Sequence, residues 1–133
     1  LAVPISRAEP IESTSRRLER LLFATPLPIF VEAARHHGPD DGLDWSTDLC
    51  SAPIVGNSGL SFDFGDACRR HDFGYRNAKR IPGRWTPSFR RLVDEQFHRD
   101  MTGLCDLRHG WEKSRCRAWA AIFYRAVRLA GGP

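Results

Sequence analysis

The chain has 133 residues, of which 41% are hydrophobic and 27% charged, and its formal net charge is +4. These values predict a single globular domain and exclude an intrinsically disordered chain. No apolar run approaches the roughly 20 residues that a membrane-spanning helix needs, which excludes an integral membrane protein.

Arginine dominates the positive charge, because 18 of the 20 basic residues are arginine. The arginines are spread along the chain and no block of five occurs. This distribution is typical of a solvated basic face, and we expect no nucleic-acid partner.

The N-terminal part of the chain predicts two short helices after a tail. Residues 1–10 form the tail, which lacks the basic start and apolar segment of an intact signal peptide. Residues 11–24 place apolar side chains at helical spacing, namely at Leu18, Leu21 and Leu22. A second helix is expected over residues 29–37. The dibasic pair Arg16-Arg17 leaves open whether the preceding tail is a propeptide or simply adjoins an ordinary helix surface.

Residues 38–61 are rich in Gly, Pro, Asp and Ser and show no clear period. We interpret this stretch as a long ordered loop, and such loops in compact domains are usually functional. Within it, Asp40, Asp41 and Asp44 are expected to be solvated carboxylates.

The rest of the chain predicts three helices. The first covers residues 62–80. The second runs from Pro87, with Thr86 as its N-cap, to about Gly103. Its apolar stripe comprises Phe89, Leu92, Val93, Phe97, Met101 and Leu104. The third starts at Cys116 and is apolar on most sides, so we expect it to be central. The fold class is therefore all-α, with one domain over residues 1–133.

Four cysteines occur without a C-x-x-C pair, so they do not form a zinc motif. An even number favours two disulfides and a secreted protein. Cysteine arithmetic alone allows three pairings. The simplest tether for Cys68 is Cys50 in the loop, and Cys105 and Cys116 would then close a tight loop before the last helix.

The stretch C-R-R-H-D-F-G-Y-R-N places His71 directly before Asp72. Adjacent residues of a helix point about 100° apart, so this pair can face two neighbouring groups at once. A Cys50–Cys68 bridge would bring Asp48 close to Asp72. Two carboxylates so close together repel each other unless a hard cation such as calcium binds both.

Together with W-S-T-D-L-C, this stretch resembles the secreted phospholipase A2 group of bacteria and fungi, over about two thirds of the chain from Asp44. The resemblance implies a helical, disulfide-bonded, calcium-dependent lipase that hydrolyses the sn-2 ester of glycerophospholipids. At matching positions, His71 resembles the general base and Asp72 a bidentate calcium ligand. The side chain of Asp48 and the carbonyl of Leu49 resemble the remaining protein ligands.

A histidine base needs an acceptor on its other ring nitrogen, and two aspartates of the following helix are candidates. Asp100 sits well inside the apolar stripe and Asp94 at its edge, so helical period alone would not choose Asp94. The segment V-D-E-Q-F-H-R-D-M resembles the family segment whose first aspartate pairs with the histidine, which selects Asp94. Asp100 then needs another partner, such as an arginine. Tyr75, one turn after His71, either bonds to Asp94 or is a packed tyrosine.

These observations predict a secreted, monomeric hydrolase with residues 38–61 as the calcium loop and 62–130 as the catalytic core. Its substrate would be a phospholipid membrane surface or micelle, without an obligate protein partner. The alternative is a non-catalytic secreted module on the same scaffold that binds calcium or lipid.

Overall fold

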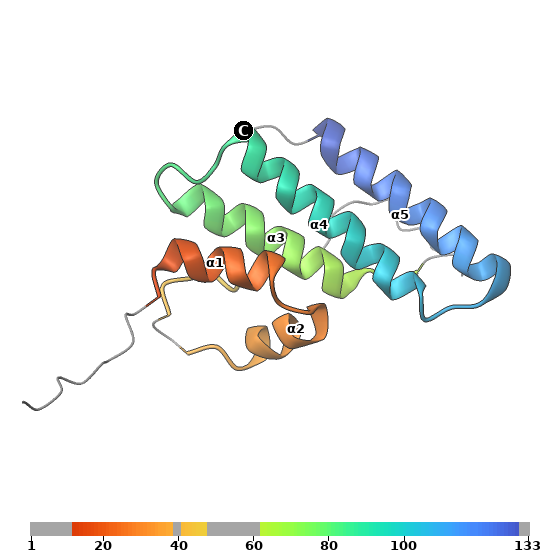
Figure 1. Cartoon of the computed structure of the whole chain (residues 1–133), viewed down its shortest axis with the longest axis horizontal. Helices are drawn as coiled ribbons and strands as arrows, with labels where there is room; N and C mark the ends of the chain where they lie inside the picture. Colours follow the sequence, from red (N-terminus) through yellow and green to blue (C-terminus); the bar gives the residue numbers. More distant parts are fainter. Residues whose placement is uncertain (1–11, 39–40, 48–61, 131–133) are drawn as a thin grey trace, which may run out of the picture.

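The computed structural model describes residues 12–38, 41–47 and 62–130, and these residues form five α-helices without a strand. The all-α prediction is confirmed. The helices in chain order are α1 (Thr14–Phe23), α2 (Leu27–Arg35), α3 (Gly65–Arg80), α4 (Pro87–Cys105) and α5 (Gly110–Ala130) (Figure 1). None of the described helices is long and apolar enough to cross a membrane.

Three long helices lie side by side, with α4 between α3 and α5, and α1 and α2 pack against α3 (Figure 1). The connections after α3 and α4 are short, so neighbouring long helices run antiparallel. The prediction that the last helix is central is wrong. Only Cys116, Ala120 and Phe123 of α5 are buried. Its Ile122 and Leu129 remain 46% and 87% exposed, because α5 packs mainly on α4 at the edge of the bundle.

Local sequence signals explain where several helices begin. The hydroxyl of Thr86 accepts a hydrogen bond from the Phe89 N–H at 3.1 Å, which confirms the predicted N-cap. Helix α2 begins before the predicted position and includes Pro28 in its first turn, where a missing N–H costs nothing. Helix α3 begins at Gly65 rather than residue 62. Helix α5 begins six residues earlier than predicted, in the polar stretch 110–115, which shows no apolar period.

The hydrophobic core has two parts. One lies among α1, α2, α3 and the start of α4, and includes the predicted Leu18, Leu21 and Leu22. The other joins α3, α4 and α5 around the disulfide between Cys105 and Cys116, a pairing that is thereby confirmed. The α4 stripe is buried as predicted except at Leu104, which is partly buried, and at Leu92, which is 45% exposed. Cys68 also belongs to a disulfide, and its predicted partner Cys50 lies outside the described residues.

Gly74 sets the spacing between α3 and its neighbours. A Cβ atom at this position would stand 2.9 Å from Cγ1 of Val93 on α4 and 3.1 Å from Cδ2 of Leu22 on α1. In protein structures, Cβ atoms almost never lie within 3.0 Å of another non-bonded heavy atom. The glycine therefore allows α3 and α4 to approach closely beside Asp94.

Candidate active site

His71 of α3 faces Asp94 of α4 across the contact between the two helices. The Nε2 atom of His71 lies 2.7 Å from Oδ1 of Asp94. The aspartate side chain is fully buried, whereas the histidine side chain is 13% exposed. The imidazole therefore bridges a buried carboxylate and the solvent.

Aromatic side chains hold the imidazole ring. The centroid of the Tyr75 ring lies 4.4 Å from that of His71, and the centroid of the Phe97 ring lies 4.5 Å away. The hydroxyl of Tyr75 donates a 2.6 Å hydrogen bond to Oδ1 of Asp94. Of the two possibilities for Tyr75, the hydrogen bond to Asp94 is therefore the one observed. One carboxylate oxygen thus receives two donors from α3.

The surroundings of Asp94 favour its charged form. Burial alone would raise the pKa of Asp94, but hydrogen bonds from His71, Tyr75 and Arg128 outweigh burial and hold the pKa below its usual value. Burial and the neighbouring carboxylate raise the pKa of Tyr75, so its hydroxyl remains a donor. The site therefore contains a negative charge directed at one nitrogen of His71.

Two arginines that the sequence did not indicate complete the surroundings of Asp94. Arg128 of α5 donates from Nη1 to Oδ2 of Asp94 at 2.7 Å. Nε of Arg90 lies 3.9 Å from the same oxygen and donates to the Tyr75 hydroxyl at 3.3 Å. The spacing of Arg90, one turn before Asp94, could have indicated an ion pair. Arg128 is 34 residues away along the chain, and only the packing of α5 brings it to the site.

Asp100 has a different partner. Arg70 donates from Nε and Nη2 to the two oxygens of Asp100, at 2.9 and 2.7 Å. The side chains are only 3% and 6% exposed, and Nη1 of Arg70 also donates to the carbonyl of Leu21 at 3.0 Å. The expected arginine partner of Asp100 is thus confirmed. This buried pair joins α3 to α4 and α1 and leaves Asp94 as the carboxylate beside His71.

Of the predicted calcium ligands, Asp72 is described, and Asp48 and Leu49 lie outside the described residues. Oδ2 of Asp72 accepts from Nε of Arg76 at 3.0 Å, and the Asp72 side chain is 22% exposed. Among the described residues, no group of three or more His, Cys, Asp or Glu side chains could hold a metal. Asp72 nevertheless fits calcium as a single ligand, because it offers a solvent-accessible carboxylate whose present ion pair is partly exposed and hence weak.

Hydrogen bonds attach the segment 41–47 to α3 near Asp72. Asn77 is buried and accepts from the N–H of Asp44 at 2.7 Å, while its amide donates to the carbonyl of Asp44 at 2.9 Å. Nη1 of Arg76 donates to the hydroxyl of Ser46 at 3.0 Å. The chain two residues before Asp48 is therefore anchored beside Asp72.

The expectation that Asp41 is solvated is wrong. Its side chain is 8% exposed and accepts hydrogen bonds from the indole of Trp45 at 2.5 Å and the N–H of Leu43 at 3.0 Å. It also forms an ion pair with Arg17 at 3.5 Å. Asp41 thus organises the start of the loop against α1. Asp44 binds the N–H and hydroxyl of Ser46, and Asp40 lies outside the described residues.

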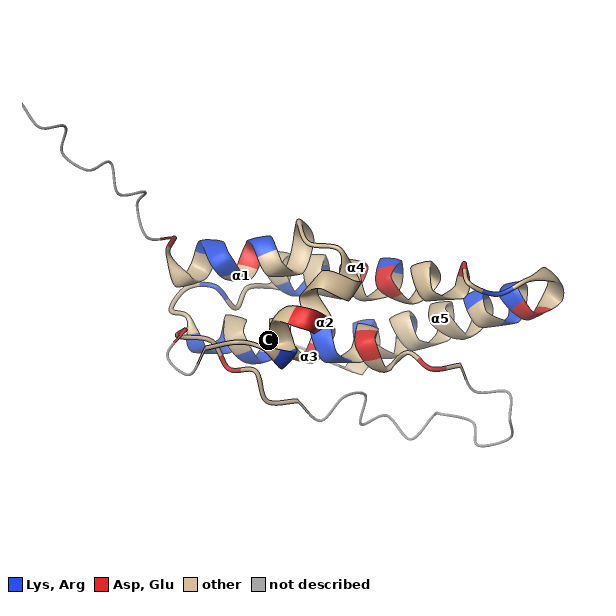
Figure 2. Ribbon diagram, turned by 90° about the horizontal axis from the view of Figure 1, so that it is seen from below, with Lys and Arg blue, Asp and Glu red and all other residues tan. Residues whose placement is uncertain are grey.

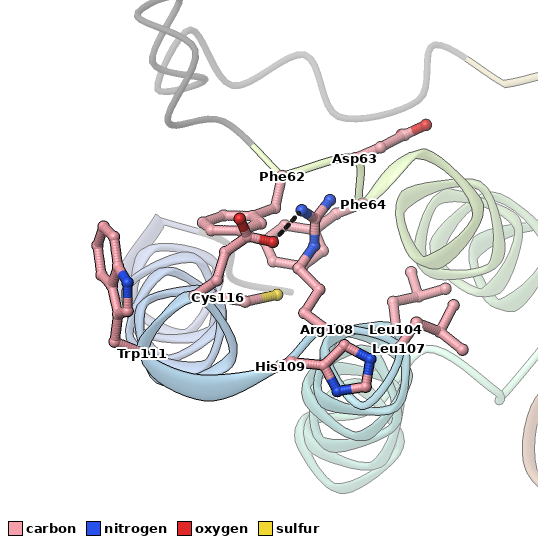
Figure 3. A pocket seen from close by; sticks show the side chains of 10 residues that line it. Phe62, Asp63, Phe64, Leu104, Leu107, Arg108, His109, Trp111 and Cys116 are labelled. Carbon is pink, nitrogen blue, oxygen red and sulfur yellow. Dashed lines mark hydrogen bonds and ion pairs between the residues drawn. The ribbon is translucent and has the colours of Figure 1, made fainter.

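A separate pocket of about 650 Å³ lies at the turn between α4 and α5 (Figure 3). Its walls include Phe62, Phe64, Leu104 and Trp111, with Arg108 and Glu112 paired at 3.1 Å across it. Neither His71 nor Asp94 lines this pocket. It is therefore distinct from the histidine–aspartate site.

The fold and the site together define a small helical protein with a histidine–aspartate dyad between two antiparallel helices. A family model described as "Prokaryotic phospholipase A2" matches residues 18–131. The chain belongs to this prokaryotic phospholipase A2 family, as the motifs around His71 predicted.

Two curated relatives agree. The chain is 37% identical over 132 residues to a protein named "Secretory phospholipase A2" from Beauveria bassiana (strain ARSEF 2860), covering 99% of this chain and 66% of that protein. It is 39% identical over 116 residues to a protein of the same name from Arthroderma benhamiae (strain ATCC MYA-4681 / CBS 112371), covering 85% and 76%. The chain thus spans about two thirds of the first relative and three quarters of the second.

Proposed function

We propose that the protein is a secreted, calcium-dependent phospholipase A2 that hydrolyses the sn-2 ester of glycerophospholipids to a lysophospholipid and a free fatty acid. The family and the names of the two relatives support phospholipase A2 chemistry. The observation that carries the mechanism is the 2.7 Å contact between a buried Asp94 and a partly exposed His71. Secretion agrees with both relatives' names and with disulfide-bonded cysteines.

The protonation state of His71 follows from its partner. A carboxylate next to Nε2 keeps the proton on that nitrogen, which leaves the lone pair on Nδ1. The neutral imidazole can then take a proton from a water molecule at Nδ1 while that water attacks the ester carbonyl. Asp94 stabilises the imidazolium that forms, and the imidazolium returns its proton to the departing glyceryl oxygen.

Water is the nucleophile in this scheme, so no serine or cysteine is needed. The described cysteines Cys68, Cys105 and Cys116 do not compete for the role, since each of them is part of a disulfide. The residues at the dyad act on protons and hold the imidazole in place. They make no covalent bond to the acyl group.

Calcium, when bound, would supply positive charge for the phosphate and for the developing oxyanion. Asp72 would be one ligand, and Asp48 and Leu49 are the proposed others. The anchoring of Ser46 by Arg76 supports this proposal, because Arg76 also pairs with Asp72. The few charged ligands suit a weak extracellular calcium site.

The alternative is a non-catalytic module that binds calcium or lipid. A buried carboxylate is costly unless it is paired. Here four donors or cations, from His71, Tyr75, Arg90 and Arg128, surround Asp94. Binding of a cation or a lipid surface does not require such an arrangement, so we favour the enzyme.

A phosphatidylcholine with different acyl chains at sn-1 and sn-2 tests the proposal. We expect release of the sn-2 fatty acid in calcium, and loss of this release when a chelator is added. Release of the sn-1 acid would contradict the positional assignment. A folded protein that binds these vesicles but releases no fatty acid in calcium would establish the non-catalytic alternative.

A further inference from the structure

The two oxygens of Asp94 are held by different parts of the fold. Oδ1 accepts two hydrogen bonds from α3, one from Nε2 of His71 at 2.7 Å and one from the hydroxyl of Tyr75 at 2.6 Å. Oδ2 receives Nη1 of Arg128 from α5 at 2.7 Å. With donors at only one oxygen, a carboxylate can still turn about its Cβ–Cγ bond. The contact at Oδ2 fixes its plane.

Arg128 is itself held in place by Arg90 of α4. Nη2 of Arg90 donates to the main-chain carbonyls of Val127 and Arg128, at 2.8 and 3.1 Å. These carbonyls belong to the last turn of α5, which lacks helical partners for its C=O groups and carries a partial negative charge. The Arg90 side chain is 8% exposed, so this contact is shielded from water.

We propose that Arg128 is a positioning residue of the active site, which fixes the carboxylate of Asp94 in the orientation that His71 requires. The last turn of α5 is then a functional part of the dyad, although it lies at the edge of the bundle. The inference rests on the proposed hydrolase activity and adds to it a third helix on which turnover depends.

A purely structural role for Arg128 has a different consequence. As a counter-charge for a buried carboxylate, Arg128 would affect stability and leave the turnover of the folded protein unchanged. A positioning role predicts a lower kcat with an unchanged KM, because the imidazole would be misaligned while lipid binding stays intact. Outer contacts that orient metal-bound histidines and carboxylates are worth about 10–100-fold, and we expect an effect of the same size here.

The experiment compares three variants of the full chain in the vesicle assay with calcium. Arg128→Gln should lower kcat by about 10–100-fold without changing KM. Arg128→Lys keeps the charge but offers no planar pair of donors, and it should give an intermediate rate. Arg125→Gln is the matched control, since it removes the same charge one turn earlier from an exposed side chain of α5. It should retain the wild-type rate.

Two further measurements keep the outcome clear if a variant is unstable. Guanidinium at millimolar concentration should restore part of the activity of Arg128→Ala, because it can occupy the vacated position beside Oδ2. In nitrogen-15 spectra, the Nε2-bound proton of His71 should be sharp in the wild type and broadened in Arg128→Gln. The positioning role would be overturned if the wild type is active and Arg128→Gln has the same kcat and the same His71 signal as the wild type. An inactive wild type would instead overturn the proposed function.

Discussion

Nε2 of His71 and Oδ1 of Asp94 lie 2.7 Å apart, and the two residues come from neighbouring antiparallel helices. Replacing His71 by Ala removes the proposed proton acceptor. Turnover should then fall by at least about 10²–10⁴, the usual worth of general base catalysis. The comparison is made per folded molecule, with thermal unfolding as the check on folding. A rate within tenfold of the wild type would assign the base elsewhere.

Asp94→Asn keeps the shape of the side chain but offers the wrong partner to Nε2, so the rate should fall while calcium affinity stays nearly unchanged. Because base and orienting residue act as a unit, the double variant should cost little more than His71→Ala alone. Asp100→Asn is the matched control on the same helix. Loss of its buried pair with Arg70 should destabilise the fold by about 3–5 kcal/mol and leave turnover per folded molecule intact. The reverse pattern would mean that Asp100 is the dyad aspartate.

The second prediction concerns calcium. Activity should disappear in excess chelator and return with calcium, but not with magnesium, which demands a tighter octahedral shell. The affinity should be on the order of 10⁻⁴–10⁻³ M, as for extracellular calcium modules. Calorimetry of Asp72→Asn should detect weaker calcium binding, with lost activity as its consequence. Full activity of the wild type in chelator would rule out the calcium mechanism.

Much of the site could be predicted from the sequence because its residues belong to local motifs. His71, Asp72 and Tyr75 lie within ten residues of one helix, and their relative positions follow from the helical period. The choice of Asp94 over Asp100 needed the family resemblance, since both lie near one apolar stripe. The structure accounts for that choice, because Asp100 is bound by Arg70, the residue before His71.

Other features depend on tertiary contacts that no local pattern encodes. The apolar composition of α5 suggested a central helix, yet α4 occupies that position and α5 exposes Leu129. The contact of Arg128 with Asp94 depends on this edge position. Asp41 was expected in solvent because loop aspartates usually are, but the Trp45 indole and Arg17 enclose it. Figure 2 shows acidic and basic positions interspersed along the helices, so charge alone did not mark the site.

The third prediction follows from the pKa of Asp94. Burial opposes its ionisation, but the bonds from His71, Tyr75 and Arg128 hold its pKa in the folded protein below the unfolded value of about 3.9. The folded state therefore binds this proton less tightly. Its contribution to stability should be complete above about pH 4 and lost as the pH falls through the folded-state pKa. The free energy of unfolding, measured with urea, should fall more steeply over this acidic range for the wild type than for Asp94→Asn.

The control for this pH dependence is Asp106→Asn. The pKa of Asp106 is also lowered, by its hydrogen bond to Arg117, but this carboxylate is exposed at the turn after α4. Salt screens exposed ion pairs more than buried ones. High salt should therefore remove the part of the acid-induced loss of stability that depends on Asp106, and leave the part that depends on Asp94. Equal acid slopes for the wild type and Asp94→Asn would contradict the lowered pKa.

The last prediction tests the close approach of α3 to α4 at Gly74. Alanine in a helix interior is usually more stable than glycine by about 1 kcal/mol. At Gly74, however, the new Cβ would lie 2.9 Å from Cγ1 of Val93, which is buried and stiff because it is β-branched. Overpacking of this kind costs about 1–3 kcal/mol, so Gly74→Ala should destabilise the protein. Its turnover should also fall, because Asp94 follows Val93 directly.

Two variants separate the steric cause from helix propensity. Gly103 is an exposed position of α4, and no atom lies within 4 Å of a Cβ added there, so Gly103→Ala should stabilise the protein by about 0.5–1 kcal/mol. In a Val93→Ala background the clash at Gly74 is largely relieved, and Gly74→Ala should then be neutral or stabilising. Denaturant unfolding of the wild type, Gly74→Ala, Val93→Ala and the double variant gives the coupling energy between positions 74 and 93. Additive effects at these two positions would show that the glycine serves a purpose other than helix spacing.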